Sequence, residues 1–204
     1  MSIVTLNDRG VRSVTTFGSL NTGSMVFIKK LTASSDSNLT FLNGSSDVVF
    51  DSTYKEYLFT LKNTHPSANP GIISFQATTD GTNYNTTVTS TYFRAYHNEA
   101  GNSTALQYAT GFDQAQGTGI INLDSGSGSD NHEASSGLLR IFNPSSTTFV
   151  KHFMGQVSDE NDGDFNHNVF TAGYFNTTSA ITGIRFSMDS GNIDAGDICL
   201  YGIN

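Results

Sequence analysis

Charged residues are scarce in this chain of 204 residues. Asp, Glu, Lys and Arg together make up 14% of it, which is about half the usual share of roughly 25%. Exposed amphipathic helices are usually built with many Lys and Glu residues. Because these residues are few, and because no apolar pattern with a period of 3.6 residues is present, the sequence argues against a helical protein.

Basic residues are the scarcer of the two charged types. Ten Lys and Arg stand against eighteen Asp and Glu, which gives a net charge of −8. No basic cluster exceeds the pair Lys29 and Lys30. A nucleic-acid-binding protein needs a positive face to neutralise phosphates, and an anionic membrane attracts the same kind of face. We therefore expect neither a nucleic acid nor a membrane as a partner.

Cysteine occurs once, so no internal disulfide can form. Cys199 lies between Ile198 and Leu200 in an apolar run that is typical of a strand. A reactive thiol usually has a cationic neighbour that lowers its pKa, and none is close in sequence. We expect a buried, structural thiol.

Long apolar runs and a targeting segment are also missing from the sequence pattern. Residues 1–10 lack the basic-then-apolar form of a secretory signal, and no run approaches the roughly 20 residues of a membrane span. We expect the protein to be made in a host cytoplasm, not to be exported by a visible signal, and to end in a virion. This expectation fits a virus particle that assembles inside its host cell.

Aromatic residues and turn formers are abundant. Fifteen Phe and eight Tyr can each bury a large area, and much of the rest is Ser, Thr, Asn and Gly. About ten to twelve β-rich runs at regular spacing favour a single antiparallel β-sandwich of the jelly-roll type. The clearest runs are residues 25–31, 39–42, 48–50, 54–62, 72–78, 84–97, 138–142, 148–153, 181–186 and 198–203.

The expected domain organisation is simple. Residues 1–23 are polar and contain several Gly, and they predict an N-terminal arm or a first edge strand. Residues 24–204 form the sandwich, and the Gly- and Ser-rich segment 124–132 is where it could split in two. From the alternation of apolar residues we expect a core that includes Phe59, Phe75, Phe142, Phe153, Phe186 and Leu200.

Three tight turns are expected to join neighbouring strands. Asn43 with Gly44, and Asp80 with Gly81, are dipeptides that favour two-residue hairpins. A third hairpin is expected to pair residues 184–188 with residues 198–200 across the turn at 191–196.

Candidate sites for metals are weak. The acidic run that contains Asp159, Glu160, Asp162 and Asp164 suggests calcium, because hard oxygen ligands in a short loop suit this ion. Counted from Asp159, however, Gly163 occupies a ligand position of the EF-hand pattern, so a solvated turn is the alternative. The histidines show no spacing typical of a zinc site; they are His65, His97, His132, His152 and His167.

Candidate sites for catalysis are equally weak. Residues 101–105, around Ser103, approach a nucleophile elbow but lack its second Gly. Glycoside hydrolysis needs two placed carboxyl groups, and the four Glu, at 56, 99, 133 and 160, have no recognisable setting. Sugar binding stays open although the chain has no Trp. The residues therefore predict no catalytic, cofactor or metal site.

Three stretches carry a resemblance to a known family. Residues 138–153 read LLRIFNPSSTTFVKHF, residues 170–174 read FTAGY, and residues 180–203 end in a strand with LYG at 200–202. Together they resemble virion structural proteins of tailed bacteriophages, particularly marine ones. That family has S-x-x-G-x-I-x-x-G before the closing strand; here Ser187 departs from the spacing, and residues 190–196 supply the turn. The resemblance covers about residues 54–204 and carries no catalytic motif.

The resemblance sets the functional expectations. It implies a non-enzymatic virion structural protein on the particle exterior, either a capsid decoration (cement) protein or a fibre subunit. The alternative is a carbohydrate- or receptor-binding module of a tail fibre, with a host surface glycan as ligand, and the third possibility is a polysaccharide-degrading enzyme. Other virion proteins are expected partners. Low charge lowers the cost of bringing flat β-surfaces together, so we also expect a homo-oligomer, and the resemblance favours a trimer.

Overall fold

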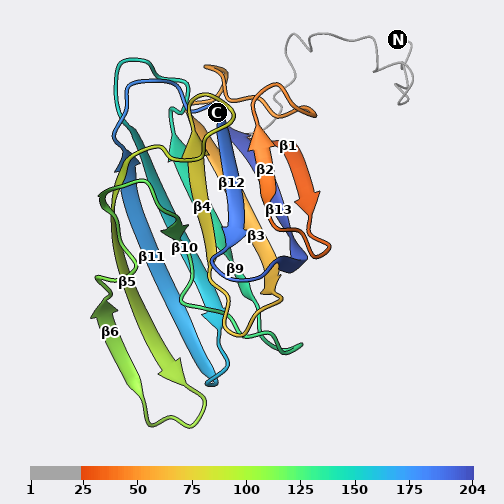
Figure 1. The fold of residues 1–204 in the computed structure, drawn as a ribbon, viewed down its shortest axis with the longest axis vertical. Coiled ribbons are helices and arrows are strands. Elements are labelled where there is room, and N and C mark those ends of the chain that lie inside the picture. Colours follow the sequence, from red (N-terminus) through yellow and green to blue (C-terminus); the bar gives the residue numbers. More distant parts are fainter. Residues whose placement is uncertain (1–23) are drawn as a thin grey trace, which may run out of the picture.

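Residues 24–204 are described by the computed structural model shown in Figure 1. This part of the chain contains thirteen β-strands and no helix, so it also has no helix that is long and apolar enough to cross a membrane. The strands form two antiparallel sheets. The all-β sandwich is thereby confirmed, while the jelly-roll connectivity stays a prediction. The arm or edge strand predicted for residues 1–23 lies outside the described residues.

The two sheets differ in size. In spatial order, the larger sheet contains β1 (Met25–Thr32), β13 (Ile193–Ile203), β3 (Glu56–Pro66), β9 (Ser135–Phe142), β10 (Lys151–Glu160), β11 (Phe165–Phe175), β5 (Val88–Asn98) and β6 (Thr104–Tyr108), with β7 (Ala115–Gly117) beside β5. The smaller sheet contains β2 (Leu39–Leu42), β12 (Gly183–Met188), β4 (Ile73–Thr78) and β8 (Ile121–Asn122).

The core lies between the two sheets and is dominated by Phe. Successive side chains of a strand point to opposite faces, and β10 shows this alternation, with Phe153 and Val157 buried and Met154 exposed. Phe75 of the smaller sheet meets Phe153 edge to face, with 5.2 Å between ring centroids. Phe59 of the larger sheet meets Phe186 in the same way, also at 5.2 Å.

Five of the six predicted core residues are buried: Phe59, Phe75, Phe153, Phe186 and Leu200 are at most 1% exposed. The prediction that Phe142 belongs to the core is wrong. This residue ends β9 one residue after the buried Ile141, so the alternation of the strand turns its ring to the outer face. There it is half-buried and lines a surface hollow.

The predicted C-terminal hairpin is wrong as well. β12 pairs with β2 and β4 in the smaller sheet, whereas β13 pairs with β1 and β3 in the larger sheet. Ile184 on β12 and Leu200 on β13 are both fully buried and belong to the same core cluster. The turn between them therefore carries the chain from one layer to the other instead of closing a hairpin.

The other two turns form, but they do not join paired strands. Gly44 has φ +81°, and its N–H donates to the carbonyl oxygen of Val48, yet residues 48–50 are not a strand. The Asp80 carboxylate accepts the N–H groups of Thr82 and Asn83, both at 2.8 Å. Beyond this second turn the chain enters β5, which lies in the other sheet from β4.

The larger sheet is also longer than the smaller one. In Figure 1, β10, β11, β5 and β6 continue past the lower end of the smaller sheet. The segment 123–134, which we call the end segment, bonds to the inner face of these strands. The Ser125 N–H donates to Asp159 of β10, the Gly128 N–H donates to the Glu160 carbonyl, and the Tyr92 hydroxyl of β5 donates to the Asp124 carbonyl. Polar contacts therefore replace the Phe-rich core at this end.

Candidate functional site

The outer face of the larger sheet is the broadest exposed surface formed by regular structure. We define the outer face by the outward side chains of residues 152–158 of β10, 166–174 of β11 and 89–97 of β5. None of these outward side chains is Asp, Glu, Lys or Arg. The outward residues are His152, Met154, Gln156, Ser158, Asn166, Asn168, Phe170, Ala172, Tyr174, Thr89, Thr91, Phe93, Ala95 and His97.

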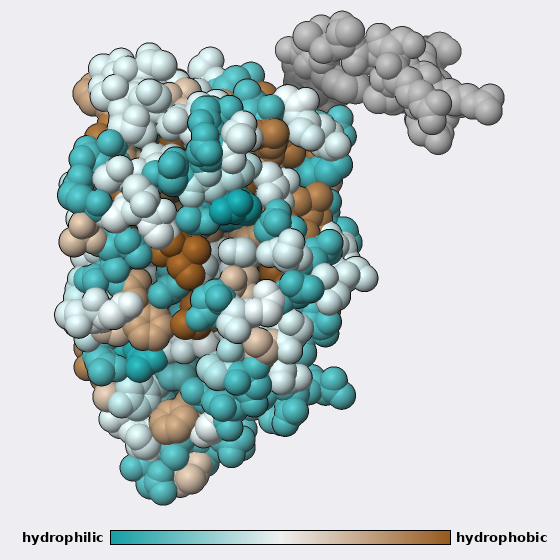
Figure 2. Space-filling model, viewed as in Figure 1, coloured by the Kyte–Doolittle hydropathy of each residue, from teal (hydrophilic) through white to brown (hydrophobic). Residues whose placement is uncertain are grey.

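Apolar side chains are prominent on the outer face. Met154 is 55% exposed and Phe93 is 40% exposed. Phe93 stacks on Phe170 of the paired strand, with 5.0 Å between the ring centroids and 10° between the planes. On the opposite side of the molecule, the space-filling view shows a largely hydrophilic or neutral surface over the smaller sheet, with only small hydrophobic patches (Figure 2).

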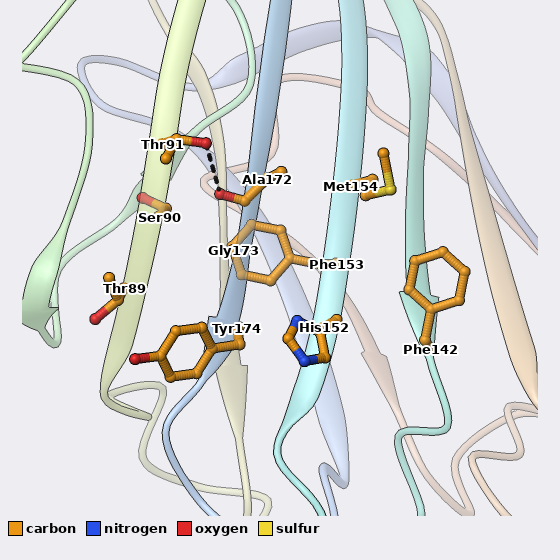
Figure 3. Close-up of a pocket in the computed structure, with 10 residues that line it drawn as sticks. All are labelled: Thr89, Ser90, Thr91, Phe142, His152, Phe153, Met154, Ala172, Gly173 and Tyr174. Carbon is orange, nitrogen blue, oxygen red and sulfur yellow. Dashed lines mark hydrogen bonds between the residues drawn. The ribbon is translucent and has the colours of Figure 1, made fainter.

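A shallow hollow of about 470 Å³ lies on the outer face (Figure 3). It forms where the short side chain of Ala172 lies beside the longer Met154, its neighbour on the paired strand. His152 and Tyr174 line the same hollow, with 5.9 Å between their rings. Chemically, the hollow offers apolar and aromatic surface and no permanently charged group, so it can bury an apolar or aromatic side chain.

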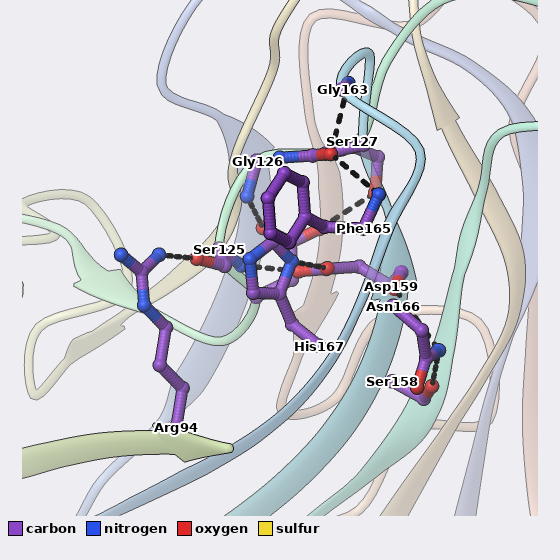
Figure 4. Close-up of polar contacts among 12 residues, drawn as sticks. Arg94, Ser125, Gly126, Ser127, Ser158, Asp159, Gly163, Phe165, Asn166 and His167 are labelled. Carbon is purple, nitrogen blue, oxygen red and sulfur yellow. Dashed lines mark hydrogen bonds and ion pairs between the residues drawn. The ribbon is translucent and has the colours of Figure 1, made fainter. Parts of the chain in front are cut away.

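A buried polar cluster lies on the inner face of the larger sheet, under the end segment (Figure 4). Asp159 on β10 is 1% exposed, and its Oδ1 is 2.6 Å from Nδ1 of His167 on β11. Its Oδ2 accepts the N–H of Ser125 at 2.5 Å. Arg94 on β5 donates to the Ser125 hydroxyl and, through Nε and a terminal nitrogen, to the Gln107 amide oxygen. We call Arg94, Asp124, Ser125, Asp159 and His167 the polar cluster.

Electrostatics single out Asp124 within the polar cluster. Burial raises the pKa of this carboxyl well above its usual range, and the nearby Asp159 carboxylate raises it further. Its oxygens accept the N–H of Ile73 at 3.0 Å and the hydroxyl of Ser127 at 3.1 Å, which only partly offsets the cost of burying the charge. Asp124 is 0% exposed, so the carboxyl has no access to a substrate and its role is structural.

The acidic run is a hairpin turn between β10 and β11. Asp159 points inward to His167, whereas Asp162 and Asp164 are exposed. Asn161 closes the turn, because its side-chain oxygen accepts the N–H groups of Gly163 and Phe165. Within residues 24–204 no three His, Cys, Asp or Glu side chains are grouped so that they could hold a metal ion.

The histidines are spread over the molecule. His152 lines the outer hollow, His97 lies on the outer face of β5, and only His167 is buried with a carboxylate partner. His65 lies near the end segment, with Nε2 3.2 Å from the Asp130 carbonyl and Nδ1 3.6 Å from Asp194. His132 belongs to the end segment itself and is exposed.

The remaining candidates have structural surroundings. Ser103 lies in the turn between β5 and β6, where its N–H donates to the Asn98 side chain. Glu56 pairs with Arg140 at 2.6 Å, and the buried Glu133 accepts the N–H of Asp130. Cys199 is buried, as expected.

The pair of Asp159 and His167 is the feature that the sequence did not reveal. The two residues are eight positions apart, with an exposed turn between them. One signal was present. A hairpin that turns at residues 161–164 places Asp159 opposite His167, and the alternation from Val157 and Val169 puts both on the buried face. Comparison with known proteins adds no further site, because no family model, curated protein or solved structure matches this chain.

Proposed function

We propose that this protein is a non-enzymatic structural component of a tailed bacteriophage particle, displayed on the exterior as a capsid decoration, cement or fibre subunit. The resemblance of residues 54–204 to such proteins supports this function. The single observation that carries it is the outer face, which is uncharged and carries the exposed Phe93 and Met154 beside the partly exposed Phe170 and Tyr174. A surface of this kind suits permanent contact with neighbouring protein subunits.

Charge favours another copy of the same chain as one neighbour. Two copies that each carry a net charge of −8 repel one another, and the repulsion is weakest where the facing surfaces carry no charge. Three strands about 4.8 Å apart and roughly ten residues long cover on the order of 500 Å², and a stable complex buries about 800 Å² per partner. The outer face can therefore supply more than half of the contact in a homo-oligomer, with the rest coming from neighbouring strands and loops. We propose a trimer on the basis of the resemblance.

The test is the position of the chain in the intact particle. Particles released from the host that produces this protein are purified, washed at high salt, and analysed by quantitative mass spectrometry and antibody labelling in the electron microscope. We expect the protein on the outside of the particle, in a copy number that is a multiple of three. Recovery only in the soluble host lysate, or only inside the particle, would contradict the proposal.

A carbohydrate-binding module is the second candidate function. The observation in its favour is a second hollow, which lies beside His167 at the far end of the larger sheet and contains an unmatched hydrogen-bonding group. This function is compatible with a place on the particle exterior, where such a module would contact a host glycan. Saturable binding of a sugar by the purified protein distinguishes it from a purely structural subunit.

A further inference from the structure

His167 has one ring nitrogen without a partner among the described residues. Its Nδ1 is bound to Asp159 at 2.6 Å, while no hydrogen bond joins Nε2 to any residue in 24–204. The whole residue is only 4% exposed. Thr60 Oγ1 is the only fully buried side-chain nitrogen or oxygen without a partner within residues 24–204. The Nε2 atom of His167 is therefore still reached by solvent, and a ligand that enters from solvent can bind it.

The surroundings of His167 fix its position. Asp159, which orients the ring, is itself held by the Ser125 N–H of the end segment. Arg94 is tied to Ser125 and to Gln107 of the neighbouring strand. Because these groups bind one another, Nε2 is presented from a rigid frame rather than from a mobile side chain (Figure 4).

A hollow of about 260 Å³ lies beside this nitrogen, lined by Arg94, Tyr96, Ser103, Asn161, Phe165 and His167. Its volume is below the roughly 300–1,000 Å³ of sites for drug-sized ligands, so it suits one small ring. Tyr96 and Phe165 contribute aromatic surface to the hollow. They pack against each other at 5.6 Å between ring centroids, and their centroids lie 5.8 Å and 6.1 Å from the imidazole of His167. Ser103 and Asn161 bring a hydroxyl and an amide to the rim.

The charge around the hollow argues against an anionic ligand. Four acidic residues belong to the adjoining turns at this end of the sheet, namely Glu99, Glu160, Asp162 and Asp164, and Arg94 is the only Lys or Arg that lines the hollow. An approaching anion would therefore meet a negative field. A neutral ligand would pay no such cost.

The hydrogen-bonding chemistry of Nε2 selects a hydroxyl group. The imidazole nitrogen accepts a hydrogen bond when the ring is neutral and donates one when the ring is protonated. A hydroxyl can donate and accept, so it matches both states. We propose that this hollow binds a neutral, hydroxyl-bearing ring of the size of one sugar unit, with a hydroxyl on Nε2 and its carbon face against Phe165 or Tyr96. The proposal rests on the second candidate function and names its site.

The experiment is a titration of the full-length, ¹⁵N-labelled protein, followed by long-range proton–nitrogen spectra of the histidine rings. The probes are D-glucose, D-galactose and N-acetyl-D-glucosamine, with D-glucuronate as the anionic comparison. At least one neutral sugar should shift the His167 Nε2 resonance saturably, with a Kd of about 1 mM. No shift at about 100 mM of any neutral sugar, or tighter binding of glucuronate, would overturn the proposal.

Two matched variants locate the site. Phe165→Leu keeps a partly exposed apolar side chain but removes the ring, and it should weaken sugar binding about tenfold, a loss of about 1.4 kcal/mol. Phe149→Leu makes the same change at a residue that is 70% exposed in the loop before β10, and binding should be unchanged. If folded Phe165→Leu binds as tightly as the original protein, the site is elsewhere. If the protein is found on the particle exterior but binds no sugar, only this inference is overturned. If the protein binds a sugar but is absent from the particle exterior, only the proposed structural function is overturned.

Discussion

Asp124 shows at the residue scale how the polar cluster affects stability. Burial and the Asp159 carboxylate raise its pKa in the folded protein above the usual value of 3.8. The folded state therefore prefers the protonated carboxyl. The stability that this preference contributes is fully present below the unfolded pKa, and it is lost as the pH rises through the folded pKa. At neutral pH, where the carboxyl of the unfolded chain is ionised, the preference of the folded state for the protonated form is a cost.

We predict that Asp124→Asn stabilises the protein at about pH 7–8 by roughly 1–3 kcal/mol, because the amide is neutral at every pH. Its oxygen can still accept the N–H groups of Ile73 and Gly126, as the carboxylate oxygen does now. Thermal unfolding of both proteins at several pH values checks this. The difference in Tm should shrink toward about pH 4, and a difference that does not change with pH would show that the charge is not its cause.

Phe75 tests the aromatic core. Its ring lies against Phe153, Phe175 and Phe186. Phe75→Ala should lower the free energy of unfolding by about 3–5 kcal/mol, because it leaves a cavity between the sheets. Urea unfolding measures the loss, with Phe149→Ala as a matched change at an exposed ring that should cost less than about 0.5 kcal/mol. Equal losses in the two variants would mean that the core is elsewhere.

The elements themselves were largely predictable, whereas their partners were not. The alternation of apolar residues located strands such as β3. Tyr57, Phe59 and Leu61 lie two positions apart in the sequence, and all three are buried in the structure. The turn at Asp80 and Gly81 formed as expected, yet a turn sequence specifies only the local backbone. Whether the next strand pairs with the previous one or crosses to the other sheet depends on contacts with distant residues. The proximity of Asp124 to Asp159 could not be predicted for the same reason, because it depends on contacts between segments that are distant in the sequence.

Gly173 tests the pairing of β11 with β5. A Cβ atom at this position would lie 2.4 Å from the carbonyl oxygen of Thr89 and 2.7 Å from Cζ of Phe153. Gly173→Ala should therefore push the strands apart and destabilise the protein by about 1–3 kcal/mol. In Gly111→Ala the new methyl group meets nothing within 4 Å, and Tm should change little. A calorimetric scan that finds the two variants equally stable would refute the close approach.

The whole molecule is asymmetric in its surface chemistry. One end of the larger sheet has acidic turns and the hollow beside His167, while the outer face carries no permanent charge across β10, β11 and β5. Composition indicated low charge, but only the strand order gathers the uncharged positions on one surface. We therefore propose that the outer face serves assembly and that the far end of the larger sheet binds a ligand.

The most direct test of this account is the mass of the full-length protein in solution, measured by light scattering over a wide dilution range. We predict an oligomer, with three chains expected. Ala172→Glu should dissociate it, because it places a charge on β11, the middle strand of the uncharged outer face. Phe149→Glu, which adds the same charge in the loop before β10, should leave the mass unchanged. A monomer at every concentration, or an oligomer that survives Ala172→Glu, would contradict the account.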